Sequence, residues 1–402
     1  MTSICCLCNE DSVNILLDVG NQPICSRFLA NPEAEEYTHP MVLGQCNTCG
    51  LIQLINPVLA SELLPRYEWI TYNEPEGHLD LLAERICSLP GLSPSASIGG
   101  VSFKDDTTLW RLKARSFSNT WRIDPLEDLG IRESSAGVET IQARLTPRSA
   151  TRIAQKYGPA DVLVVRHILE HASSLSGFMD AIRQMIRPQG YAVFEVPDCV
   201  SALEKKDYTS LWEEHTAYFT PETFRFCFAL AGFRFHYYGC HPYPFENSLV
   251  AIVQPQVNNR KPIFLSGNAL ADEQRKAQAY AADFPQYSTR IKEYLNTFRR
   301  KKGKIALFGA GHLGCKYVNF FGLSNEVEFF VDDHPAKQGL FMPGSRLPIY
   351  SSAALLEKGI KLCLLSLNPL NEENVIQKHQ KFVQQGGIFT SIFPGSKHAL
   401  KI

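Results

Sequence analysis

The residues best suited to chemistry lie in one short stretch, residues 211–219, which reads Leu-Trp-Glu-Glu-His-Thr-Ala-Tyr-Phe. An imidazole changes its charge near neutral pH, so His215 is the natural proton acceptor of this stretch. A neighbouring carboxylate, such as Glu214, orients an imidazole and holds its proton, while aromatic side chains exclude water. This combination favours an enzyme that removes a proton from a weakly acidic C–H bond. The structural alternative is an aromatic turn before a helix that starts near Pro221.

The bulk composition limits the kinds of partner. The chain has 402 residues, 45% hydrophobic and 20% charged, with a formal net charge of −1. These values describe an ordinary globular protein of two or three domains. Without a basic excess or a long apolar run, we expect neither nucleic acid nor a membrane as partner. The first residues show no signal-peptide pattern, so the expected location is the cytoplasm, where thiols stay reduced.

Six of the twelve cysteines lie in the first fifty residues. Cys5 and Cys8 form one C-x-x-C pair, and Cys46 and Cys49 form another, which Gly50 follows. Two such pairs can bring four thiolates to a tetrahedral Zn²⁺. A redox couple is the alternative for a single pair. Four protein ligands leave no open position, so the spacing predicts a structural zinc site.

Helical and strand patterns alternate between residues 79 and 255, which predicts an α/β fold with a doubly wound parallel sheet. Residues 161–165 read as a buried strand, and residues 121–124 read as a strand that ends in Asp124. The element order resembles class I S-adenosylmethionine-dependent methyltransferases. The resemblance implies this cofactor, with Asp124 at its ribose and with Asp105 and His167 as further contacts. The glycines usual in the family's first loop fall on or near Ser102 and Asp106.

The carboxyl-terminal part carries a second nucleotide-binding pattern. A strand over residues 304–308 runs into Gly309-Ala310-Gly311-His312-Leu313-Gly314, and Asp332-Asp333 follows about twenty residues later. Taken alone, this fingerprint indicates NAD, with the phosphate at a helix N-terminus. The family resemblance described next implies contact with a phosphate or sugar here, without a redox cofactor, and we weigh that interpretation above NAD.

Three features together point to one family. The paired cysteine knuckles, the methyltransferase-like middle and Glu214-His215-x-x-Tyr218-Phe219 resemble the sugar C-methyltransferases of nucleotide-linked 4-keto-6-deoxysugars. The resemblance implies that His215 removes the proton at C3, that Glu214 supports it, and that the enolate attacks the cofactor methyl group. It also implies an aromatic partner from the first domain, Tyr67 in preference to Tyr72.

The same resemblance implies contacts with the substrate. The sequence of this chain departs from the family's pattern at one point. Tyr218 and the three glycines Gly309, Gly311 and Gly314 are the expected contacts with the nucleotide-sugar. The family usually has Tyr-His before its Glu-His, whereas Trp212 and Glu213 stand there in this chain.

The predicted organisation is therefore a zinc-binding domain over residues 1–72, a methyltransferase-like domain over residues 73–256, and a linker helix with a Rossmann-like domain over residues 257–402. Two other functions stay open. One is a protein that has lost the cofactor and epimerises or only binds a sugar nucleotide. The other is an NAD-linked sugar oxidoreductase that uses residues 309–314.

Overall fold

The computed structural model describes residues 3–67, 69–70, 74–256 and 265–401. Its chain forms two compact units, which we describe separately. The first unit comprises Met1–Leu16, Leu43–Val200 and Glu214–Arg275, and the second comprises Leu17–Val42, Ser201–Glu213 and Lys276–Ile402. Over the described ranges, none of the helices combines the length and the apolar character that a bilayer span requires.

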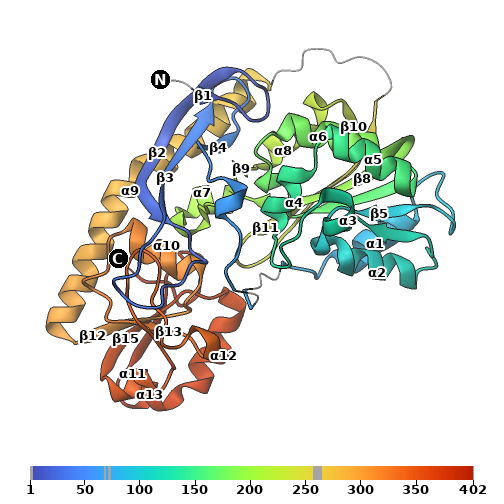
Figure 1. Ribbon diagram of the computed structural model, residues 1–402. Helices are drawn as coiled ribbons and strands as arrows, with labels where there is room; N and C mark the ends of the chain where they lie inside the picture. Colours follow the sequence, from blue (N-terminus) through green and yellow to red (C-terminus); the bar gives the residue numbers. More distant parts are fainter. Residues whose placement is uncertain (1–2, 68, 71–73, 257–264, 402) are drawn as a thin grey trace. The chain divides into compact units, whose positions relative to one another are not determined.

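A five-stranded sheet carries the cysteine knuckles (Figure 1). Its strand order is β1-β2-β3-β4-β9. The strands are β1 (Ser3–Ile4), β2 (Asp11–Pro23), β3 (Thr38–Cys46), β4 (Ile52–Ile55) and β9 (Ala217–Tyr218). The last strand comes from the stretch that holds His215, and Ile52 of β4 pairs antiparallel with Tyr218 of β9. The sheet therefore joins the amino-terminal knuckles to the segment with the predicted base.

The first unit contains a six-stranded sheet with the order β10-β11-β8-β7-β5-β6. The strands are β5 (Ile98–Gly100), β6 (Thr120–Arg122), β7 (Ala160–Arg166), β8 (Ile186–Asp198), β10 (Phe233–His241) and β11 (Asn247–Pro255). The four strands β6, β5, β7 and β8 are parallel, whereas β11 and β10 are antiparallel additions at one edge. The carboxyl ends of the parallel strands meet at one edge of the sheet, where such folds bind ligands.

Helices cover both faces of this sheet because both faces are apolar. Val162 and Val164 of β7 pack with Leu79 of α1 and Leu112 of α2, whereas Leu163 packs in the other cluster, with helices α5, α6 and α8. The helices of this unit are α1 (Leu79–Cys87), α2 (Asp106–Ala114), α3 (Pro125–Leu129), α4 (Val138–Arg144), α5 (Pro147–Tyr157), α6 (Leu175–Met185) and α8 (Pro221–Leu230). The α/β fold with parallel strands predicted from the sequence is confirmed.

The second unit contains an all-parallel sheet with the order β14-β13-β12-β15-β16. The strands are β12 (Lys304–Phe308), β13 (Phe330–Val331), β14 (Ile349–Tyr350), β15 (Ile360–Leu365) and β16 (Ile388–Ser391). The helices are α7 (Val200–Lys205), α9 (Gly267–Lys301), α10 (His312–Phe320), α11 (Ala354–Glu357), α12 (Pro369–Lys378) and α13 (Gln380–Gln384), with α7 and α9 beginning in the first unit. Gly309 and Gly311 of the fingerprint lie in the loop from β12 to α10, and Gly314 lies in the first turn of α10.

Candidate active site and zinc site

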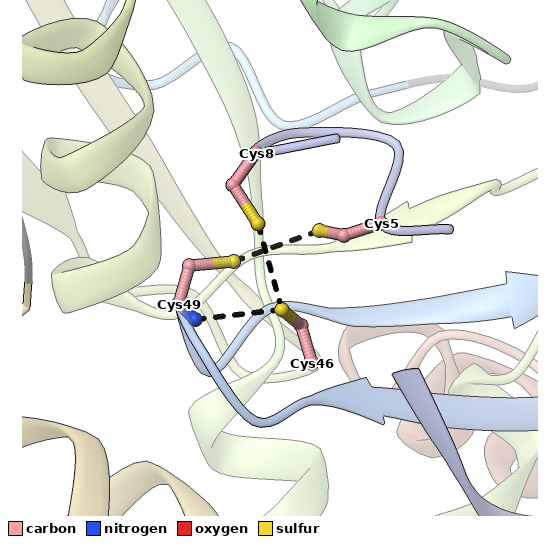
Figure 2. Close-up of side chains that lie close together, drawn as sticks. All are labelled: Cys5, Cys8, Cys46 and Cys49. Atoms are coloured by element: carbon pink, nitrogen blue, oxygen red, sulfur yellow. Dashed lines mark hydrogen bonds between the residues drawn. The ribbon is translucent and has the colours of Figure 1, made fainter. Parts of the chain in front are cut away.

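The four cysteines of the two knuckles lie together (Figure 2). The Sγ atoms of Cys5 and Cys49 are 3.6 Å apart, and those of Cys8 and Cys46 are also 3.6 Å apart. Four sulfurs at about 2.3 Å from one tetrahedral zinc ion would be about 3.8 Å from each other. The donor set and its spacing therefore fit Zn²⁺, and all four ligand positions belong to the protein.

The surroundings of the knuckles favour a thiolate at Cys46 and a structural role for the four cysteines. Cys46 Sγ accepts hydrogen bonds from the backbone N–H groups of Thr48 and Cys49, 3.4 Å away in each case. The Cys49 thiol, followed by those of Cys5 and Cys8, holds the pKa of Cys46 well below its usual range. Cys5, Cys46 and Cys49 are buried in the same hydrophobic cluster as the strands and helices of the six-stranded sheet. A metal ion held by these cysteines would link the knuckles to the core of the first unit.

Hydrogen bonds of Thr216 hold the His215 segment against the turn that follows β7. Thr216 N–H donates to the carbonyl of Glu170 at 2.8 Å, and Thr216 Oγ1 donates to the carbonyl of Ala172 at 2.7 Å. On its other side, the carbonyl of Thr216 accepts from Leu54 N–H at 3.0 Å. His215 is thus fixed between the 3₁₀ turn η3 (Leu169–His171) and β4.

The His215 ring is half-buried among other rings. Its centroid lies 4.7 Å from that of His171, edge to face at 87°, and 6.1 Å from that of Tyr218. His171 Nδ1 lies 3.1 Å from a carboxylate oxygen of Glu139. Burial alone would lower the pKa of His171, but the Glu139 carboxylate raises it. The imidazole predicted as the base is therefore packed against a carboxylate-held histidine, away from bulk solvent on that side.

The two adjacent glutamates belong to different units. In the second unit, Glu213 accepts a hydrogen bond from Cys25 N–H at 2.6 Å and contacts Cys25 Sγ at 3.4 Å. Trp212, also in the second unit, stacks on His312 with 4.4 Å between ring centroids. Glu214 is buried in the first unit together with His215. The Trp-Glu pair that replaces the family's Tyr-His therefore has structural contacts of its own.

Tyr67, the predicted aromatic partner, lies in the first unit and stacks on Trp69 with ring centroids 4.9 Å apart. Its role in catalysis stays a prediction. Tyr72, the alternative, lies outside the described residues.

The first loop of the six-stranded sheet is filled by Asp105. Its carboxylate accepts hydrogen bonds from the backbone N–H groups of Val101, Ser102 and Arg166 at 2.7 to 2.8 Å. A Cβ atom on Gly100 would lie 3.1 Å from Asp105 Cβ, so the side chain occupies the space beside that glycine. Burial raises the pKa of Asp105 to about 7, against the opposing effect of the backbone donors. Asp105 supports the loop from within, and its predicted direct contact with the cofactor stays a prediction.

Asp124 lies where the family resemblance expects the ribose-binding acid. It lies two residues after the end of β6 and is exposed. Its Oδ1 caps α3 by accepting from Leu126 N–H and Glu127 N–H, and its other oxygen has no hydrogen bond within the described part of the chain. A spare carboxylate oxygen suits two ribose hydroxyl donors. The residues at this edge therefore fit the adenosine end of S-adenosylmethionine.

His167 lies at the end of β7 with an unusual backbone, φ 47°. It contacts Glu195 at 3.2 Å and Glu170 at 3.5 Å. Burial alone would lower its pKa, but the carboxylates of Glu74 and Glu195 raise it to about 10. Arg166 binds the same Glu195 at 2.5 Å. The predicted cofactor residue His167 is thus part of a buried ionic network, and a direct cofactor contact stays a prediction.

The three fingerprint glycines of the second unit have different surroundings. Gly309 has φ 108°, and a Cβ there would lie 2.8 Å from Ser366 Oγ; a Cβ on Gly314 would lie 2.8 Å from the carbonyl of Gly309. A Cβ on Gly311 would meet nothing within 4 Å. Close packing explains the glycines at 309 and 314. At Gly311 there is open space, at the start of α10.

Three contacts of the described residues were not predicted from the sequence: Glu139 with His171, Arg166 with Glu195, and the stacking of Trp212 on His312. Glu139 and His171 are 32 residues apart, and Trp212 and His312 are 100 apart. Neither separation leaves a local pattern. A buried carboxylate opposite a buried histidine is recognisable only once both have been placed on their elements.

Family models match three consecutive segments of the chain. A "Putative zinc binding domain" matches residues 5–63, a methyltransferase domain matches residues 76–237, and a C-methyltransferase C-terminal domain matches residues 267–394. The fold and these matches define an S-adenosylmethionine-dependent methyltransferase with a four-cysteine zinc site.

Within that class, the chain matches the C-methyltransferases over all three of its parts. It is 24% identical over 411 residues to the C-methyltransferase NovU of Streptomyces niveus, covering 97% of this chain and 95% of the relative.

Two solved structures are also similar. A SAM-dependent methyltransferase from Anabaena variabilis is 16% identical, with 44% of this chain and 84% of the other covered and a TM-score of 0.30. An O-methyltransferase family protein from Burkholderia thailandensis is 12% identical, with 46% and 59% covered and a TM-score of 0.30.

Proposed function

We propose that this methyltransferase acts at C3 of a nucleotide-linked 4-keto-6-deoxysugar, with His215 as the base. One observation carries the proposal: His215 is half-buried against His171 at the carboxyl edge of the sheet, in a chain that matches the C-methyltransferases throughout. The sugar substrate itself comes from the sequence resemblance. A proton next to a ketone is weakly acidic, and an imidazole is suited to removing it.

The side chains near His215 have distinct proposed tasks. His215 accepts the C3 proton on its unprotonated ring nitrogen, and Glu214, its buried neighbour, supports the imidazolium that forms. The rings of His171 and Tyr218 keep water from that nitrogen, and Tyr218 also contacts the sugar. Negative charge then develops on the C4 oxygen, where a donor must meet it, and Tyr67 is our candidate.

The cofactor would be held by the loop at residues 99–107 and by the free oxygen of Asp124, with Asp105 and His167 as further candidate contacts. When bound, S-adenosylmethionine supplies an electrophilic methyl group. The task of the chain is to position C3 in line with that group and to exclude water around it.

The nucleotide end of the substrate is proposed to lie at Gly309, Gly311 and Gly314. The open space at Gly311 leaves room for a diphosphate at the start of α10. Asp332 argues against NAD at this place, because its carboxylate already accepts from Ala310 N–H at 3.1 Å and contacts Lys337 Nζ at 2.8 Å. In NAD-binding proteins the equivalent acid serves the ribose. A melting shift with NAD would favour the oxidoreductase alternative.

Replacement of the base tests the proposal directly. His215→Asn should lower methyl transfer by about 10² to 10⁴, the range of a general base. Zinc content and the affinity for S-adenosylmethionine should stay at wild-type values. His236→Asn, which changes an exposed histidine of β10, is the matched control and should keep full activity. Wild-type turnover in His215→Asn would remove His215 as the base.

The filled first loop supports one competing function, a sugar-nucleotide protein without cofactor. Calorimetry with S-adenosylmethionine separates the two, since the competitor predicts no heat at millimolar ligand. Exchange of the C3 proton with deuterated solvent is a second readout. Exchange without cofactor binding would indicate an epimerase-like protein that keeps His215 as its base.

A further inference from the structure

Three potential metal ligands gather beside the predicted base. Glu170 and His171 of η3 and His215 each offer one ligand atom, and these atoms all lie within 4.8 Å of one another. The Thr216 hydrogen bonds to the carbonyls of Glu170 and Ala172 fix this arrangement, because they hold both chain segments in register. The cluster is therefore part of the fold of the first unit.

One carboxylate oxygen of Glu170 is buried without a hydrogen-bond partner among the described residues, and a cation would stabilise it. Its Oε1 lies 3.5 Å from His167 Nδ1, whereas its Oε2 is buried and has no hydrogen-bond partner among the described residues. An unpaired buried carboxylate oxygen is costly. Solvent does not reach this atom, so a bulky ligand cannot meet it without rearrangement. An ion held between the side chains can.

A buried carboxylate lies close to the His171 ring, as it does beside many metal-binding histidines. Its Nδ1 faces the buried carboxylate of Glu139 at 3.1 Å, which leaves Nε2 for another partner. A carboxylate behind the ligating histidine fixes the ring and raises its basicity as a ligand. A cation bound to His171, with the Glu139 carboxylate on the other side of the ring, would have the same arrangement.

We propose that Glu170, His171 and His215 form a second divalent-cation site, distinct from the four-cysteine site, which takes a borderline cation such as Zn²⁺ or Co²⁺. Two histidines and one carboxylate suit these ions, and three protein ligands leave a coordination position open. His215 is only half-buried, whereas Glu170 and His171 are buried. The cation bonds to the same lone pair that accepts the proton, so occupancy blocks the base.

Cobalt titration of the zinc-loaded protein tests the site. With the cysteines occupied by zinc, one Co²⁺ per chain should give weak visible absorption without the thiolate-to-cobalt charge-transfer band. Glu170→Gln and His215→Asn should abolish this absorption, and Glu139→Gln should weaken cobalt binding about tenfold. His236→Asn is the matched control and should bind as the wild type does.

Two results would overturn the site: no visible absorption at millimolar Co²⁺, or an unchanged titration in both Glu170→Gln and His215→Asn. Circular dichroism of each variant shows whether a loss reflects unfolding. Retained binding in the folded His215→Asn variant would remove His215 from the ligand set that we propose.

Inhibition of methyl transfer by the bound cation rests on the proposed function of His215. The experiments distinguish a failure of the metal site from a failure of that function. Added Zn²⁺ should inhibit methyl transfer by the wild type at the concentration that displaces bound cobalt. If cobalt binds but activity persists, the metal site stands and His215 is not the base. If His215→Asn is inactive and no cobalt binds, the base stands and the metal site falls.

Discussion

At the scale of single residues, the hydrogen bonds that each carboxylate oxygen already accepts determine which further groups the side chain can bind. The carboxylate of Glu213 contacts Cys25 in the second unit, whereas Glu214 is buried in the first unit with His215. Asp124 divides its two oxygens, with Oδ1 capping α3 and the other left over. The identity of a residue therefore predicts its chemistry only after its hydrogen bonds have been counted.

Asp124 allows its two tasks to be separated. Asn caps helices about as well as Asp, so Asp124→Asn should leave the thermal midpoint nearly unchanged. It replaces a charged acceptor, and hydrogen bonds to charged groups contribute about 1.5–3 kcal/mol. We expect calorimetry to give a dissociation constant for S-adenosylmethionine about 10- to 100-fold higher.

The control for this experiment is Asp124→Ala, which removes both the cap and the charge. It should bind as weakly as Asp124→Asn and also lose about 1 kcal/mol of stability. Wild-type affinity in both variants would show that Asp124 does not contact the ribose.

Asp105 makes the stability of the first loop depend on pH. Its pKa is about 7 in the fold against 3.8 as the reference, so the folded chain holds a proton that the unfolded chain releases. The stability that this proton contributes is complete below pH 3.8 and is lost as pH rises through about 7. Between about pH 5.5 and 7, the free energy of unfolding of the wild type should fall relative to Asp105→Asn.

Denaturant unfolding at several pH values measures this difference. The amide does not titrate, so the variant should lack this part of the slope, although it is less stable at every pH because it loses an acceptor. Parallel curves for the two proteins would mean that Asp105 is ionised throughout the range.

At the scale of elements, much of the architecture could be predicted because its signals are local. The buried strand β7, the capping box at Thr220 before α8 and the glycine fingerprint before α10 are each written in a few consecutive residues. The paired C-x-x-C knuckles likewise carry their own spacing. Contacts such as His171 with Glu139 depend on how separate elements pack, and no short pattern encodes that packing.

The same limit explains the first loop. The sequence indicates that the usual glycines are missing, but not what replaces them. In the structure Asp105 turns inward and ties together the ends of β5 and β7 through Val101, Ser102 and Arg166. A side chain that bonds three separate backbone groups is a property of the folded loop.

The glycine loop of the second unit offers a paired test. Gly311 has an ordinary extended backbone, and a Cβ would meet open space, so Gly311→Ala should fold with wild-type stability. If a diphosphate approaches there, the added methyl should weaken binding of the nucleotide-sugar by about tenfold, or 1.4 kcal/mol. Calorimetry with the nucleoside diphosphate alone is a sufficient probe.

Gly309→Ala is the contrasting variant. Its φ of 108° and the close approach to Ser366 predict a loss of about 1–3 kcal/mol in stability. If Gly311→Ala binds the diphosphate as tightly as the wild type, the ligand does not approach at that point.

At the scale of the whole molecule, a series of adjacent elements in the first unit connects the four-cysteine site to the proposed base. The Cys46–Cys49 knuckle leads directly into β4, β4 pairs with β9, and β9 begins two residues after His215. The knuckle cysteines also belong to the hydrophobic cluster of the six-stranded sheet. We therefore expect a metal ion at the knuckles to influence the reaction through the position of β4 and β9.

Removal of zinc should reveal this dependence. Cys46→Ser should lower the zinc content below one ion per chain, lower the thermal midpoint and reduce methyl transfer, because β4 no longer holds the His215 segment. Cys87→Ser, at the end of α1, is the matched control and should keep zinc and activity. Full activity in zinc-free protein would show that β9 is positioned without the metal.

The pairing of β4 with β9 also bears on how oxidants would affect this chain. Peroxide attacks thiolates, and a knuckle sulfur converted to a sulfenic acid no longer holds its ion. Oxidation of a knuckle cysteine, which has no proposed contact with the sugar, would thus lower methyl transfer by displacing His215. Repair by a reductant and fresh zinc would restore it.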